Sequence, residues 1–112
     1  VFKPYRFTMI HYLQDDYAVA FEQADRVVVT ELYTAGEVPI PGVDTEMLCK
    51  RIRERCDVVE YVHDMSAIAQ HLDGTVDAPA TVIFFGGDDL FQVADGYIKA
   101  RNDADRGPIT AP

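Results

Sequence analysis

The sequence predicts an α/β fold, more specifically a three-layer α/β/α sandwich in which a mostly parallel, Rossmann-like sheet is flanked by helices. Short apolar runs of strand length alternate four times with segments whose apolar residues recur every three or four positions. Two of the runs show almost no polar alternation, which is typical of strands covered on both faces. With 112 residues, 48% of them hydrophobic, one domain can bury a core without metal or disulfide.

The first half of the chain predicts a strand, a helix and a second strand. The first strand surrounds Phe2, and Pro4 restricts it to an edge or terminal position because proline lacks the N–H of a ladder hydrogen bond. Residues 9–24 fit one face of a helix, and Thr8 is the expected N-cap. Residues 26–33 then predict the second strand.

The second half continues the same alternation. A loop over residues 34–42 holds two prolines and two glycines, and Asp44 or Thr45 is expected to cap the helix that follows it. The inward positions of that helix are Met47, Leu48, Ile52 and Cys56. The remaining elements are a strand over residues 58–62, a short helix opened by Asp64, a strand over residues 81–85, and a last helix with Leu90, Val93, Ala94, Tyr97 and Ile98 inward.

The last eleven residues carry Gly, Pro and charge without periodicity. We therefore expect residues 1–101 to form one domain and residues 102–112 to be a disordered tail.

The two cysteines are expected to be free. Cys49 and Cys56 lie seven residues apart on one predicted helix, about 10 Å along its axis. That separation exceeds the Cα distance of about 7 Å that a disulfide tolerates. Their expected role is that of small core residues, with redox or metal chemistry as the alternative.

The acidic balance of the chain excludes several classes of function. Ten Lys and Arg against nineteen Asp and Glu give a net charge of -9, which disfavours nucleic-acid and membrane-surface partners. No apolar run reaches the roughly 18 to 20 residues of a membrane helix, so a cytoplasmic protein is expected. The four basic residues near positions 50–55 are interpreted as a solvated helix surface. No metal site is expected from His11, His63 or His71, which lack a second ligand at metal spacing.

Ligands of parallel sheets bind beyond the carboxyl ends of the strands, where the sequence places Tyr5 and Arg6, residues 33–42, His63, and residues 86–89. Two of these groups could carry chemistry. Gly86, Gly87, Asp88 and Asp89 join a strand to a helix start, where they form either an anion site or a tight turn with a capping aspartate. Arg6 has a planar guanidinium suited to a carboxylate or phosphate, and a structural ion pair is the equal alternative.

Three motifs carry a resemblance to the Mur ligases, and most of all to the UDP-N-acetylmuramate:L-alanine ligases. Residues 31–44, ELYTAGEVPIPGVD, are similar to the family's Y-x-A-G-E-x-P-I-x-G stretch. Residues 1–8, VFKPYRFT, resemble F-Q-P-H-R-Y-T, and residues 86–93 resemble G-A-G-D-I-x-x-V. The matches fall in the right order and span residues 1 to about 98. The sequence departs from the family at Tyr5, Met9 and Asp88, where His, Arg and Gly are usual.

The resemblance implies the carboxyl-terminal domain of an ATP-dependent ligase of peptidoglycan synthesis, which activates the muramate carboxylate with ATP and Mg before the L-alanine amine attacks it. It implies as partners the central ATPase and N-terminal UDP-binding domains of the same parent chain, together with L-alanine and UDP-N-acetylmuramate. Carried over by position, Arg6, Gly36, Glu37 and Asp89 would contact or shape the substrate site, and Gly86 and Gly87 would contact a nucleotide or anion.

This stretch contains no phosphate-binding loop of the G-x-x-x-x-G-K-[ST] kind. The fragment alone is therefore expected to bind no ATP or Mg and to be inactive as a ligase. The alternative is a stand-alone acidic α/β module with a regulatory or Mg-binding role.

Overall fold

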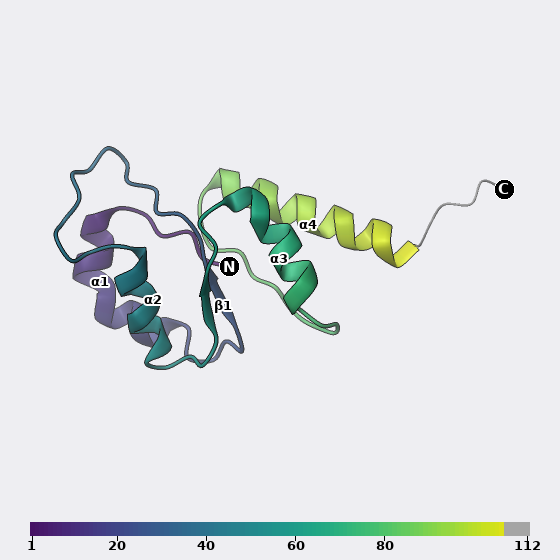
Figure 1. Ribbon diagram of the computed structural model, residues 1–112, viewed down its shortest axis with the longest axis horizontal. Helices are drawn as coiled ribbons and strands as arrows, with labels where there is room; N and C mark the ends of the chain where they lie inside the picture. The colour runs from purple at the N-terminus through teal and green to yellow at the C-terminus, as the bar shows by residue number, and fades with distance from the viewer. Residues whose placement is uncertain (107–112) are drawn as a thin grey trace.

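The computed structural model describes residues 1–106, in which helices surround a small parallel sheet (Figure 1). The elements in chain order are α1 (Phe7–Ala20), β1 (Val27–Val29), α2 (Thr45–Arg53), β2 (Val59–Tyr61), a 3-10 turn η1 (Met65–Ala67), α3 (Ile68–Thr75) and α4 (Asp88–Arg106). In Figure 1, α1 and α2 lie on one side of β1, whereas α3 and α4 lie on the other. The expected α/β class is confirmed.

The sheet is parallel and is built around the N-terminal segment. β1 pairs with β2 in the register Val27↔Val59 to Val29↔Tyr61. On the other side of β1, Phe2 forms parallel bridges with both Val29 and Phe85. The extended segments therefore lie in the order β2, β1, residues 1–5 and residues 83–85, so that the first residues of the chain are in the middle of the sheet.

Of the two positions expected from Pro4, an edge of the sheet or a terminal position, the edge is wrong. The Phe2 N–H donates to the Val28 carbonyl at 2.8 Å on one side, and the Lys3 N–H donates to the Phe85 carbonyl at 2.9 Å on the other. Pro4 is tolerated because it lies just beyond the end of β1, where its carbonyl accepts from the Tyr33 N–H at 3.0 Å and no N–H is needed.

The strands are shorter than the apolar runs that predicted them. Pairing along residues 26–33 stops after Thr30, opposite Pro4, and resumes only as the single bridge Tyr5↔Tyr33. Residues 81–85 form no regular strand, since they pair only with residues 1–3, through Phe85 and the Ile83 carbonyl.

Side chains on the two faces of the sheet belong to two separate cores. Val27 and Val29 pack with Ile10, Leu48 and Ile52 of α1 and α2. Val28 points the other way and packs with residues of α3 and α4, namely Ile68, Leu72, Leu90 and Tyr97. Because neighbouring residues of a strand face opposite sides, this division confirms that β1 is covered on both faces.

The helix starts agree only partly with their sequence signals. Asp44 caps α2 as expected, since its side chain accepts from the Met47 N–H at 2.8 Å. Asp64 likewise accepts from the Ser66 N–H at 2.9 Å, where the turn η1 leads into α3. Thr8 is not the cap of α1. The helix already begins at Phe7. Its N-cap position is Arg6, with φ 67, and the Arg6 side chain makes no capping hydrogen bond.

The end of the chain also differs from expectation. α4 continues to Arg106, so residues 102–106 are helical rather than part of a disordered tail, and residues 107–112 lie outside the described residues. Ile98, expected to face the core, is 54% exposed. The neighbouring Tyr97 is buried in the core that α4 shares with α3, so the core-facing side of the helix at this level is taken by Tyr97 and not by Ile98.

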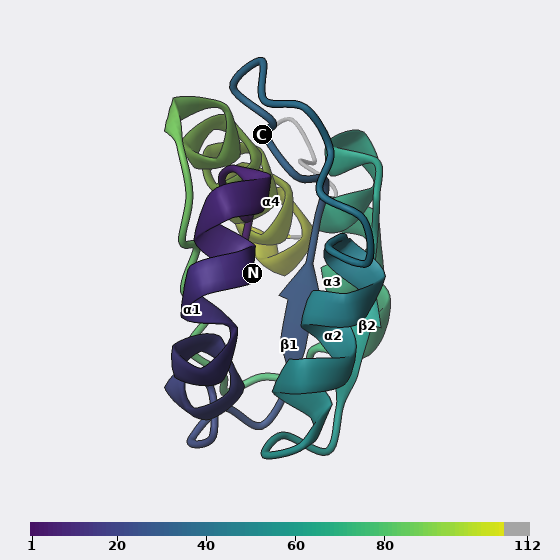
Figure 2. The same cartoon turned by 90° about the vertical axis from the view of Figure 1, so that its left-hand side faces the viewer.

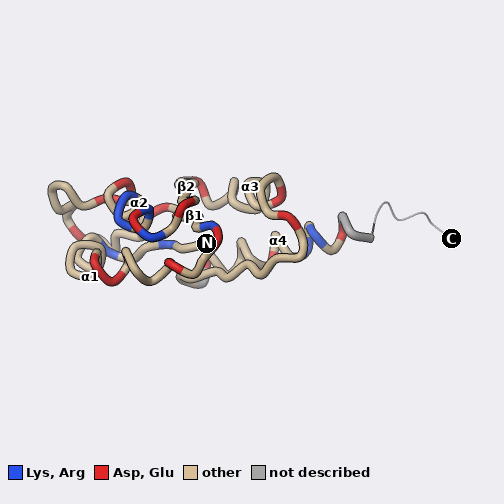
Figure 3. Tube along the Cα trace, turned by 90° about the horizontal axis from the view of Figure 1, so that it is seen from below, with Lys and Arg blue, Asp and Glu red and all other residues tan. Residues whose placement is uncertain are grey.

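Basic residues gather on α2, as Figure 3 shows. They are more than the expected solvated surface, because Arg51 pairs with both Asp15 of α1 and Glu54. Arg55 and Glu22 form a further pair at 3.7 Å. The Arg51–Asp15 pair crosses between α1 and α2, which lie side by side over β1 in Figure 2.

Both cysteines are free and buried, as expected. Burial raises the pKa of the Cys49 thiol, which keeps it in the neutral form of a small core side chain. None of the helices described in residues 1–106 is long and apolar enough to cross a membrane.

The first core should be sensitive to loss of volume. Leu48 is fully buried between α2 and the sheet, so Leu48→Ala should lower the free energy of unfolding by about 2 to 5 kcal/mol. Val38→Ala is the matched control, because Val38 is 82% exposed and its loss should change stability by less than about 0.5 kcal/mol. Urea denaturation measures both. Equal effects of the two changes would contradict this description of the core.

Candidate ligand-binding site

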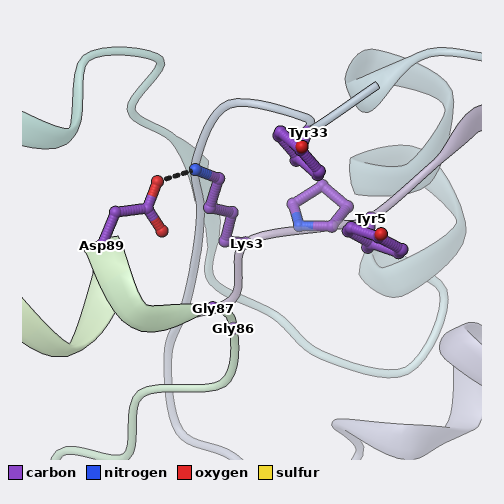
Figure 4. Close-up of a pocket in the computed structure, with 7 residues that line it drawn as sticks. Lys3, Tyr5, Tyr33, Gly86, Gly87 and Asp89 are labelled. Atoms are coloured by element: carbon purple, nitrogen blue, oxygen red, sulfur yellow. Dashed lines mark hydrogen bonds and ion pairs between the residues drawn. The ribbon is translucent and has the colours of Figure 1, made fainter. Parts of the chain in front are cut away.

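A cavity of about 420 Å³ lies at the edge of the sheet where the extended segments end (Figure 4). It is lined by Lys3, Pro4, Tyr5, Tyr33, Gly86, Gly87 and Asp89. These residues come from three stretches of sequence: the N-terminal segment, the chain after β1, and the start of α4. The cavity therefore occupies the crevice beyond the carboxyl ends of the strands, where ligands of parallel sheets bind.

Lys3 is the buried charge of the site, with only 8% of its surface exposed. Its ammonium forms an ion pair with Asp89, and a Glu31 carboxylate oxygen lies 4.0 Å away. The ammonium also lies 5.8 Å from the centre of the Tyr33 ring. Lys3 thus connects the middle of the sheet to the first turn of α4 (Figure 4).

Asp89 is held by contacts on both of its carboxylate oxygens. Oδ2 pairs with the Lys3 ammonium, and Oδ1 accepts from the Leu90 N–H at 2.9 Å. The hydrogen bond from Lys3 is the main reason why the pKa of Asp89 lies below its ordinary value. The Leu90 N–H also donates to the Gly87 carbonyl at 2.9 Å. These contacts are those of a tight turn with an aspartate at the helix start.

Gly86 permits the close approach of this turn to the N-terminal segment. A Cβ atom at Gly86 would lie 2.7 Å from the Leu90 Cδ2 atom and 3.0 Å from the Lys3 Cβ atom. Any larger residue would push the turn away from Lys3. Gly87, in contrast, has only the Asp89 Oδ1 atom nearby, at 3.6 Å from such a Cβ.

A stack of rings and cations borders the cavity. The Tyr5 and Tyr33 rings are stacked, with centres 5.2 Å apart and planes inclined by 23°. The Arg6 guanidinium lies 5.0 Å from the Tyr5 ring centre, and Lys3 approaches the Tyr33 ring. Both tyrosines are about half exposed, so they present an aromatic surface at the mouth of the site.

Arg6 lies beside the cavity and does not line it. Its guanidinium contacts Tyr5, whose hydroxyl lies 3.5 Å away and raises the pKa of Arg6. Among the described side chains, no carboxylate is within ion-pair distance of it, so the structural ion pair considered from the sequence is absent there. The backbone of Arg6 has φ 67, a strained conformation for a residue with a side chain. This conformation lets the chain turn from the sheet into α1.

Gly36 and Glu37 also lie outside the cavity wall. Gly36 has φ 78 and follows Ala35 with φ 55, so the loop turns sharply just before Glu37. The Glu37 carboxylate accepts from the Thr8 hydroxyl at 2.6 Å and from the Thr8 N–H at 3.2 Å. The hydroxyl hydrogen bond is the main cause that lowers the pKa of Glu37. Glu37 thus supplies from a distant loop the capping interaction that the start of α1 lacks locally.

Sequence reasoning placed Tyr5, Tyr33, Gly86, Gly87 and Asp89 in the crevice beyond the strand ends, and all five line the cavity. It missed Lys3 and Pro4. A basic residue between two residues of a buried strand was the available signal for Lys3, because such a charge requires a partner.

Within the described residues no three His, Cys, Asp or Glu side chains gather in a group that could hold a metal ion.

The sequence matches no protein-family model. It does match curated proteins along most of its length. It is 36% identical over 104 residues to a UDP-N-acetylmuramate–L-alanine ligase of Desulfatibacillum aliphaticivorans, a match that covers 91% of this chain and 23% of that protein. It is 38% identical over 100 residues to the ligase of the same name from Syntrophotalea carbinolica, and 38% over 102 residues to that from Symbiobacterium thermophilum. These matches cover 88% and 89% of this chain. The chain spans a little over a fifth of its relatives' length, and the matched stretch is their C-terminal part.

The ion pair between Lys3 and Asp89 can be tested through the pKa of the carboxyl group. The folded protein lowers that pKa, so the stabilisation from Asp89 is complete above its unfolded value of about 3.9. It is lost as the pH falls through the lowered value. In Lys3→Met, the pKa of Asp89 in the folded protein should rise towards the ordinary value, as measured by NMR titration of the carboxyl carbon.

Asp64 is the internal control for that titration. Its pKa is lowered by the Ser66 hydroxyl, which the change at Lys3 does not touch, so it should stay where it is. If the pKa of Asp89 were also unchanged in Lys3→Met, the ion pair would not be the cause of its low value.

Proposed function

This chain is a homologue of the C-terminal part of the UDP-N-acetylmuramate–L-alanine ligases, and from that premise we propose that it is the C-terminal, substrate-closing domain of such a ligase in peptidoglycan biosynthesis. The observation that carries the proposal is identity of 36 to 38% over about nine tenths of the chain. The proposed reaction is ATP-dependent formation of an amide bond between the muramate carboxylate and the amine of L-alanine.

The geometry of the site supports the proposal, because it joins the three sequence stretches that carry the family resemblance. The bridge Tyr5↔Tyr33 connects the first stretch to the second, and the hydrogen bonds between Thr8 and Glu37 connect them again. The ion pair of Lys3 and Asp89 connects the first stretch to the third. Segments that are far apart in sequence therefore meet at one edge of the sheet, around one cavity.

Arg6 is the residue we assign to anion binding. It is exposed beside the cavity, and no carboxylate neutralises it among the described side chains. Its guanidinium can therefore form charge-assisted hydrogen bonds with a substrate carboxylate or phosphate. Lys3 is less suited to that role, since Asp89 and Glu31 already surround its ammonium.

The other predicted residues have supporting roles in this proposal. Glu37 and Gly36 hold the loop after β1 against the start of α1, next to Arg6. Gly86 and Gly87 allow the turn at α4 to approach the sheet, and Asp89 orients Lys3. In this assignment they shape the wall against which the substrate closes.

ATP and Mg fit this chain only in part. Arg6 offers one available cation to a phosphate group, and no metal-binding group is found in the described residues. We propose that the central ATPase and N-terminal UDP-binding domains of the same parent chain hold most of the nucleotide, the metal and the UDP-N-acetylmuramate. When bound, ATP supplies the phosphoryl group that activates the muramate carboxylate. The part of this chain is then to bind charge through Arg6 and to exclude water by closing over the site.

We further propose that, in the complete enzyme, the four parallel segments form the full sheet of a three-layer α/β/α sandwich in a domain covering residues 1–101. The two cores on opposite faces of β1 support this architecture. A cytoplasmic location is proposed with it, in keeping with the ATP-dependent reaction proposed above.

The isolated chain should fold and yet lack ligase activity. It should show no ATP hydrolysis that depends on L-alanine and UDP-N-acetylmuramate, because the proposed nucleotide and metal ligands belong to other domains. Release of phosphate by the purified chain is the measurement. Turnover that follows the chain through purification and disappears in Arg6→Ala would overturn the assignment of catalysis to the other domains.

The role of Arg6 is tested in the complete parent enzyme. Arg6→Ala should lower kcat/KM at least about tenfold, equivalent to about 1.4 kcal/mol in the barrier, and Arg6→Lys should restore part of it. Arg55→Ala is the control, since Arg55 lies two residues beyond α2 and pairs with Glu22 outside the cavity wall, and its loss should leave turnover unchanged. A rate unaffected by Arg6→Ala would remove Arg6 from the site. A parent without any ligase activity would favour a regulatory or Mg-binding role for this acidic α/β module.

A further inference from the structure

A second cavity, of about 500 Å³, lies at the opposite end of the sheet from the candidate site. It begins at Val1 and is bounded by residues 23–28 on one side and residues 79–83 on the other. Val1 itself is the first residue of the segment in the middle of the sheet. The cavity, which we call the strand groove, therefore lies in line with the central segment, between the two chains that flank it.

The hydrogen bonds around Val1 are those of a strand ladder. The Phe85 N–H donates to the Val1 carbonyl at 2.8 Å, and the Val1 nitrogen donates to the Ile83 carbonyl at 2.8 Å. On the other side, the Phe2 N–H donates to the Val28 carbonyl. The terminal nitrogen thus occupies the place of a ladder amide. If the central strand continued in the same register, its next backbone hydrogen bonds would be made with the Val28 N–H and the Arg26 carbonyl on one side and with the Ile83 N–H on the other.

We propose that the strand groove holds a further length of the central strand, formed by the residues that join Val1 on its N-terminal side in the longer parent protein. The proposal rests on the proposed function for the existence of that parent, whose relatives are more than four times as long as this chain. In this register, the residue directly before Val1 opposes Val27 and Ile83, and the residue two positions further back opposes Asp25 and Thr81.

The walls of the strand groove indicate the chemistry of this segment. Phe2 packs in the core under α1 and α2, and Val1 packs in the core under α3 and α4. Because side chains alternate along a strand, the residue before Val1 would face Phe21, Ala24 and Val27, and the one before that would face Leu72, Val76 and Val82. All six line the strand groove. The segment should therefore be apolar on both faces, with no polar alternation.

The charge at Val1 supports the same occupant. Burial lowers the pKa of the terminal ammonium, because a charged group loses hydration at this position. A peptide bond there would keep the hydrogen bond to the Ile83 carbonyl and remove the charge.

The experiment compares N-terminal extensions of the full chain. Thr-Val-Ile-Val added ahead of Val1 should raise Tm by at least about 5 °C over Gly-Ser-Gly-Ser, since it adds apolar burial and ladder hydrogen bonds. Both extensions remove the charge from Val1, so the comparison isolates the segment. Hydrogen exchange of the Val28 and Ile83 amides should slow at least tenfold only with the apolar extension.

Thr-Val-Ile-Pro is the matched control of similar length and apolarity. Its proline has no N–H for the Arg26 carbonyl, so it should lose at least half of the gain in Tm. Equal Tm values for all three chains, or an equal gain with proline, would overturn the proposal. So would a dimer of the unextended chain that Thr-Val-Ile-Val dissociates in sedimentation velocity, since the groove would then hold a second copy. None of these measurements needs ligase turnover, so failure here is distinguishable from failure of the proposed function.

Discussion

The ion pair between Lys3 and Asp89 joins the middle of the sheet to the start of the last helix, and most of the site depends on the segment that carries it. Residues 1–5 hydrogen bond to β1 on one side and to Phe85 on the other. Parallel strands cannot be joined by a tight turn, so neighbours in this sheet come from distant parts of the chain. A central segment therefore touches more distant sequence than any edge strand does. For this reason the first eight residues contact both the loop after β1 and the turn before α4.

The buried charge of Lys3 restricts which residues can lie next to this central segment. A buried ammonium is costly unless a partner compensates it, and Lys3 has Asp89 and Glu31 within reach and the Tyr33 ring beside it. The pair also requires the turn at Gly86 to come close, because a Cβ there would strike Leu90 and Lys3. Gly86, Lys3 and Asp89 therefore depend on one another. Lys3 can be buried because Asp89 pairs with it, and the pair can form because Gly86 lets the turn come close.

Local signals in the sequence predicted the local features well. Asp44 caps α2 through its own side chain, because capping depends on residues close in sequence. The unbroken apolar run of Val27 to Val29 likewise indicated a strand buried on both faces. Predictions failed where distant residues decide. Thr8 has the right side chain for a cap, but Glu37 from another loop binds it inside the first turn of α1. Pro4 occupies a central segment because β1 happens to end opposite it, which no local rule reveals.

The site follows the same division. Gly86, Gly87 and Asp89 could be predicted because a glycine pair between an apolar run and a helix marks the crevice of a parallel sheet. Lys3 could not be assigned, since its partner lies 86 positions away. The stacking of Tyr5 on Tyr33 could not be predicted either, because it depends on where the pairing between β1 and the N-terminal segment stops and resumes.

The two ends of the central segment are linked by register. Phe2 faces the core under α1 and α2, whereas Val1 and Lys3 face α3 and α4. A slip of one residue would exchange these faces, placing the Lys3 ammonium in an apolar core and Phe2 next to Asp89. Backbone bound in the strand groove adds rungs to the same ladder and so raises the cost of such a slip. The apolar end of the sheet, far from any substrate, thereby helps to keep Lys3 and Asp89 in place at the end where chemistry is proposed to occur.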